Sequence, residues 1–106
     1  MSVDTDITGA EKERATLGVD IELTGALVAR AGVRQGRVGV PQGSTVADAV
    51  RAWADGSGDH LRFALLEAER LRSDVAAHRV SEGRDERLIA SEPVRNGDTV
   101  RFGYRE

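Results

Sequence analysis

The sequence has 106 residues, which is enough for one small domain with a single core. It contains no cysteine, and this excludes disulfide bonds, thiolate metal sites and cysteine nucleophiles. The net charge of −3 gives no general attraction to nucleic acid or anionic membranes, and the apolar runs are too short to cross a bilayer. Because the N-terminus also lacks the basic and apolar segments of a secretory signal, we predict a cytoplasmic, monomeric protein.

Residues 1–18 carry several acidic side chains and no sustained apolar period, so we predict a disordered acidic tail. From Val19, apolar and polar residues alternate, which predicts a half-buried strand over residues 19–24. An apolar connection between two glycines, Ala26–Ala31, leads to a second strand over residues 34–40, which a proline and a glycine end.

The clearest local signal lies at Thr45, whose hydroxyl is suited to cap a helix while Asp48 completes a capping box. The apolar residues that follow have the spacing of one helix face: Val46, Ala49, Val50 and Trp53. The glycine-rich residues 55–58 end this helix. A second, short helix is predicted over residues 60–68.

The remaining chain favours strands. Residues 73–80 predict a third strand, and residues 84–89 predict a short strand or a turn. Asn96, Gly97 and Asp98 form a strong turn signal before a last strand over Thr99–Tyr104. This order of strands and helices predicts the α+β class. The predicted core is Val19, Ile21, Leu23, Val38, Val40, Val46, Val50, Trp53, Leu65, Val100 and Phe102.

Two segments in this order, residues 41–48 (PQGSTVAD) and residues 94–100 (VRNGDTV), resemble motifs of a known family. The chain is similar to ubiquitin-like β-grasp proteins of the sulfur-carrier branch. That branch includes the small subunit of molybdopterin synthase, the thiamine sulfur carrier and the small archaeal modifier proteins. The resemblance implies a β-grasp domain over residues 19–106, with a mixed sheet of four or five strands, one main helix across it and a second short helix.

The same resemblance implies a function through protein contacts, with an adenylating enzyme or the larger subunit of a molybdopterin synthase. In this family the chemistry belongs to a C-terminal Gly-Gly pair, whereas this sequence ends with Gly103, Tyr104, Arg105 and Glu106. Three explanations stay open: a member without carrier function, a sequence that lacks its last residues, or a different terminal chemistry. The alternative function is a β-grasp interaction module that is not conjugated to other molecules.

No set of residues indicates an active site, a metal site or a cofactor. His60 and His78 are too far apart in the sequence to form a recognised metal-binding pair. The acidic residues 55–59 lack the spacing and the closing glutamate of a calcium loop. We therefore predict a protein that is not an enzyme, or is at most a cosubstrate or a non-catalytic subunit.

An arginine-rich stretch is the one candidate for binding nucleic acid: Arg70, Arg72, Arg79, Arg84 and Arg87. Acidic residues alternate with these arginines and cancel much of their attraction for phosphate. No exposed aromatic platform for stacking is predicted either, because Trp53, Phe63 and Phe102 are assigned to core faces. The stretch is therefore predicted to be a solvated face, with no nucleic-acid partner.

The outward face of the sheet is the predicted partner-binding site. If the first strand lies between the second and the last, Asp20 and Glu22 stand between Arg37 and Arg101. Such cross-strand pairs of opposite charge contribute about 0.2–1 kcal/mol each and help to fix the register. They serve either solubility alone or the polar docking of a protein partner.

Overall fold

The computed structural model describes residues 16–105, and its first strand starts at Thr16. The prediction placed residues 16–18 in the tail, but they belong to the first strand, because Leu17 and Gly18 pair with Val40 and Gly39 of the next strand. The rest of the predicted tail, residues 1–15, lies outside the described residues, as does Glu106.

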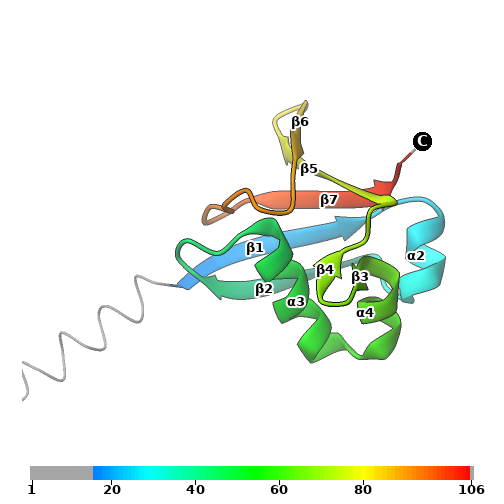
Figure 1. Ribbon diagram of the computed structural model, residues 1–106. Helices are drawn as coiled ribbons and strands as arrows, with labels where there is room; N and C mark the ends of the chain where they lie inside the picture. Colours follow the sequence, from blue (N-terminus) through cyan, green and yellow to red (C-terminus); the bar gives the residue numbers. More distant parts are fainter. Residues whose placement is uncertain (1–15, 106) are drawn as a thin grey trace, which may run out of the picture.

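Five strands form one mixed sheet in the order β2-β1-β7-β5-β6 (Figure 1). β1 runs antiparallel to β2 and parallel to β7, and β5 runs antiparallel to both β7 and β6. The α+β class and the position of the first strand between the second and the last are confirmed. The strands are β1 Thr16–Leu23, β2 Gln35–Pro41, β5 Val75–Ser81, β6 Arg84–Leu88 and β7 Thr99–Tyr104.

The main helix, α3 (Val46–Ser57), begins at the predicted capping box. Asp48 N–H donates to the Thr45 hydroxyl over 3.2 Å, and Thr45 N–H donates to the Asp48 carboxylate over 3.0 Å. Gly58 ends the helix in a backbone conformation with φ 97°, which favours glycine. The predicted face, which includes Val50 and Trp53, is buried against the sheet.

The two sequence segments that resemble the family motifs lie against each other. Val46 N–H donates to the Glu92 carbonyl over 2.9 Å, and Val94 N–H donates to the Ser44 carbonyl over 2.9 Å. The loop before β7 therefore satisfies a backbone donor in the first turn of α3, a group that has no partner within its own helix.

Two shorter helices differ from the sequence predictions. Ala26–Ala31, predicted only as an apolar connection, is the helix α2, which buries Leu27 and Ala31 and ends at Gly32 with φ 79°. The second predicted helix is α4 (Asp59–Leu65) and is shorter than expected, because Leu66 adopts extended backbone angles. Within residues 16–105, no helix is long and apolar enough to span a membrane.

A small hairpin that the sequence did not predict follows α4. Its strands are β3 (Leu66–Glu67) and β4 (Arg70–Leu71), and its two turn residues, Ala68 and Glu69, have φ values of 53° and 64°. Left-handed backbone at both turn positions usually requires glycine or asparagine. Arginines on the neighbouring helices hold this turn in place: Arg51 donates to the Glu69 carbonyl over 2.8 Å, and Arg62 pairs with the Glu69 carboxylate.

The core lies between the sheet and the three helices. Of the predicted core residues, all but Val38 are buried; Val38 is only partly buried, because β2 forms one edge of the sheet. Further side chains complete the core, chiefly Leu27, Leu61, Val75, Leu88 and Val94.

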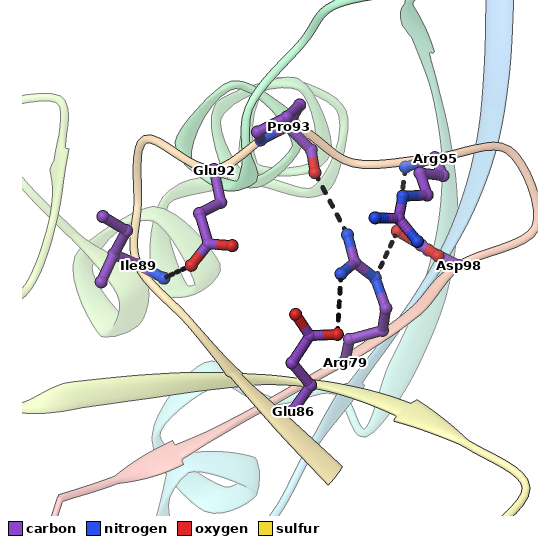
Figure 2. A network of polar contacts seen from close by, with 7 residues as sticks. All are labelled: Arg79, Glu86, Ile89, Glu92, Pro93, Arg95 and Asp98. Atoms are coloured by element: carbon purple, nitrogen blue, oxygen red, sulfur yellow. Dashed lines mark hydrogen bonds and ion pairs between the residues drawn. The ribbon is translucent and has the colours of Figure 1, made fainter. Parts of the chain in front are cut away.

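A buried arginine fastens the loop between β6 and β7 (Figure 2). Arg79 of β5 donates to the Asp98 carboxylate over 3.0 Å, to Glu86 over 3.1 Å and to the Pro93 carbonyl over 3.2 Å. Burial by itself lowers the pKa of Arg79, but the hydrogen bonds to Asp98 and Glu86 outweigh burial and leave the pKa above its ordinary value. Arg79 therefore keeps its charge and fixes the start of β7.

Candidate functional site

The face of the sheet opposite the helices carries two cross-strand ion pairs. Asp20 lies directly opposite Arg37 in the register of β1 and β2, and the Arg37 guanidinium is 3.4 Å from the Asp20 carboxylate. The Arg37 side chain is 68% exposed, and that of Asp20 is 45% exposed. This pair is open to solvent, so its contribution to folding stability is small.

The second pair joins β1 to β7. Glu22 lies opposite Arg101, whose Nε is 3.1 Å from the Glu22 carboxylate. Arg101 also approaches Asp85 of β6, at 3.9 Å. The four residues predicted from the sequence are therefore brought together on one face, and a shallow hollow runs between Glu22 and Arg37. We call Asp20, Glu22, Arg37 and Arg101 the open sheet face.

Of the C-terminal residues singled out from the sequence, Gly103 and Tyr104 belong to β7 and Arg105 follows it, while Glu106 lies outside the described residues. Gly103 pairs with Ala76 of β5, and a Cβ atom at Gly103 would lie 2.6 Å from the Thr24 hydroxyl. Tyr104 ends β7, and Arg105 N–H donates to the Asp74 carbonyl over 2.9 Å. Gly103 is therefore a close-packed strand residue.

Two assignments in the arginine-rich stretch and its surroundings are wrong. Arg79 is not on a solvated face but is 7% exposed, since it lies on the same side of β5 as the inward-facing Val75 and Ala77. Phe63 is not part of the core: it is 65% exposed, because the buried face of α4 is formed by its neighbours Leu61, Ala64 and Leu65.

The two histidines lie on different elements. His78 lies on β5 opposite Arg101, and His60 is an exposed residue of α4. Within the part of the chain that the structure describes, no three histidine, aspartate or glutamate side chains are grouped to hold a metal ion.

The fold is similar to that of two solved proteins. Small archaeal modifier protein 1 from Haloferax volcanii has a TM-score of 0.68 and 23% sequence identity, over 85% of this chain and 99% of that one. The chain has the ubiquitin-like β-grasp fold. A putative molybdopterin converting factor, subunit 1, from Pyrococcus furiosus has a TM-score of 0.59 and 18% identity, over 85% of this chain and 99% of that one.

Sequence comparison with protein-family models gives no match, and comparison with curated proteins gives none either. At identities of 23% and 18%, the structural likeness establishes the β-grasp fold. Both similar structures belong to small proteins whose names denote a modifier or a converting-factor subunit. The role of this chain has to be argued from its own surface.

Proposed function

We propose that this β-grasp protein works through contacts with a protein partner, which is an adenylating enzyme or the larger subunit of a molybdopterin-synthase-like complex. The open sheet face is the docking surface in this proposal. The observation that carries it is the placement of four charged side chains on the face opposite the helices, in two ordered cross-strand pairs. Such a polar surface favours specific, reversible contacts over permanent association.

A second candidate function is a β-grasp interaction module that is never conjugated. The position of Gly103 favours it, since this glycine is paired within the sheet and packed against Thr24. A thin, flexible tail, which carrier chemistry needs to reach an active site, is not supplied by this residue.

Mass spectrometry of the protein isolated from its own cells separates the two functions. Carrier or modifier chemistry predicts a terminal thiocarboxylate or a covalent adduct with another protein. The interaction module predicts an unmodified protein that still binds the adenylating enzyme or synthase subunit encoded in the same genome. An unmodified protein that binds neither would contradict the proposed function.

A further inference from the structure

Two shallow hollows lie on either side of the end of β7. Arg30, Phe63 and Arg72 are among the residues that line the first hollow, and Arg87 and Arg105 are among those that line the second. Tyr104 connects the two: it lines the second hollow, and its hydroxyl accepts a hydrogen bond of 3.4 Å from Arg30. Figure 1 shows this end of β7 beside the turn that leads into α2.

Positive charge is concentrated here although the whole sequence has a net charge of −3. Five arginines line the two hollows, against two glutamates. Arg72 is paired with Asp74, and Arg62 with Asp55 and Glu69. These two guanidinium groups are therefore already neutralised within the protein.

The other three arginines are available. Among residues 16–105, the side chains of Arg87 and Arg105 make no hydrogen bond or ion pair. Arg30 makes no ion pair; it donates one hydrogen bond to the uncharged Tyr104 hydroxyl and interacts with Asp74 only at longer range. We call Arg30, Arg87 and Arg105, together with Tyr104, the basic end. The second hollow also contains His78.

An exposed aromatic ring stands at the rim of the basic end. Phe63 is 65% exposed in the first hollow, next to the buried Leu66. Arginine and aromatic side chains are the residues that most often dominate the binding energy of protein interfaces. The combination fits a partner that brings both carboxylates and an apolar side chain.

We propose that the basic end binds an acidic segment of a protein partner, with an apolar side chain of that segment against Phe63. The inference rests on the proposed function only in requiring a protein partner. A protein segment fits better than a nucleic acid, because a peptide can place carboxylates at the arginines and uncharged residues opposite Glu67, Glu69 and Asp74, whereas a nucleic acid carries a phosphate at every nucleotide.

The test uses the full ¹⁵N-labelled chain and a short synthetic peptide in which glutamates alternate with glycines around one central leucine. Titration followed by NMR is expected to shift the amide signals of Arg30, Phe63, Tyr104 and Arg105, with binding that weakens as salt is added. The double variant Arg87→Glu, Arg105→Glu is expected to weaken binding by about tenfold. Its matched control, Arg84→Glu at the far end of β6, is expected to leave binding unchanged.

Equal weakening by Arg84→Glu, or shifts spread over the whole surface, would overturn the inference. Tighter binding of an oligothymidylate of the same charge at the same residues would overturn it in favour of nucleic acid. Arg87→Gln with Arg105→Gln repeats the test without introducing new repulsion, and the dispersion of the NMR signals confirms folding. The peptide result is independent of any adenylating enzyme, so the proposed function can fail while this inference stands.

Discussion

At the scale of single residues, packing contacts show which glycines of β2 are required, and the composition alone does not. The indole of Trp53 packs over the backbone of Gly36 in β2, and a Cβ atom at Gly36 would lie 2.4 Å from the indole nitrogen. At Gly39, on the same strand, the nearest atom to such a Cβ is a methyl group of Thr16 at 3.5 Å. Gly36 is therefore required by packing, whereas Gly39 is not.

We expect Gly36→Ala to lower the free energy of unfolding by about 1–3 kcal/mol, because Trp53 has to move away from its packed position. Gly39→Ala is the matched control and is expected to change it by less than about 0.5 kcal/mol. Urea unfolding of the two variants, followed by Trp53 fluorescence, measures both changes. Equal effects of the two substitutions would contradict the close packing of Trp53 on Gly36.

The Arg79 network gives a second prediction at this scale. Arg79→Met removes the ion-pair partner of Asp98, a carboxylate whose side chain is only 11% exposed, and is expected to destabilise the protein by about 3 kcal/mol. Arg84→Met, at an exposed position of the same hairpin, is expected to cost less than about 0.5 kcal/mol. Thermal unfolding compares the two, and an Arg79→Met variant as stable as the control would contradict the network.

The environments of the two wrongly assigned residues are readable from the sequence. The alternation along β5 places Arg79 on the same side as Val75 and Ala77, so its burial follows from the period of the strand. The interpretation of the arginine-rich stretch as one solvated face overlooked this alternation. The exposure of Phe63 also follows from a period, because Leu61, Ala64 and Leu65 share one face at helical spacing and Phe63 lies off that face.

At the scale of elements, capping and turn chemistry explain both the successes and the failures of prediction. The capping box of Thr45 and Asp48 marks the start of α3, and the turn before Thr99 marks the start of β7. The six residues of α2 are too few to display a helical period. The turn of the β3–β4 hairpin uses Ala68 and Glu69 where glycine or asparagine is usual, so its stability depends on contacts from other elements.

The capping box predicts that the free energy of unfolding depends on pH. Thr45→Ala is expected to lower the free energy of unfolding by about 1 kcal/mol. Thr45→Ser is expected to retain most of the stabilisation that the Thr45 hydroxyl provides. The hydrogen bond from the Thr45 backbone holds the pKa of Asp48 below its ordinary value, against the opposing effect of burial. The unfolded chain therefore takes up this proton at a higher pH than the folded chain, so the stabilisation is present above the ordinary pKa and is lost as the pH falls through the folded value.

Asp48→Asn tests this dependence, because asparagine cannot ionise. The difference in stability between the natural protein and Asp48→Asn is expected to shrink between about pH 7 and about pH 3. Urea unfolding at both pH values measures the difference. A difference that grows in acid would contradict the lowered pKa of Asp48.

At the scale of the whole molecule, the fold and the surface carry different information. The order of the elements predicted the α+β class, and the resemblance of residues 41–48 and 94–100 to family motifs implied the β-grasp fold. The likeness to the archaeal modifier supports that fold at a TM-score of 0.68. The ion pairs of the open sheet face followed from strand order and alternation. The basic end was not predicted, because Arg30, Arg87 and Arg105 are distant in the sequence and only the folded chain brings them together.

We propose that the open sheet face binds the adenylating enzyme or synthase subunit encoded in the same genome. Exchanging one pair, as Asp20→Arg with Arg37→Asp, keeps an ion pair and the net charge while reversing the charge pattern that a partner meets. The exchange is expected to leave folding stability within about 0.5 kcal/mol of the natural protein.

Isothermal titration calorimetry with that partner is the most direct measurement. The exchange variant is expected to bind about tenfold more weakly than the natural protein, because like charges then face each other across the interface. Arg84→Glu, away from the open sheet face, is expected to bind with unchanged affinity. An exchange variant that binds as tightly as the natural protein would contradict docking through this face.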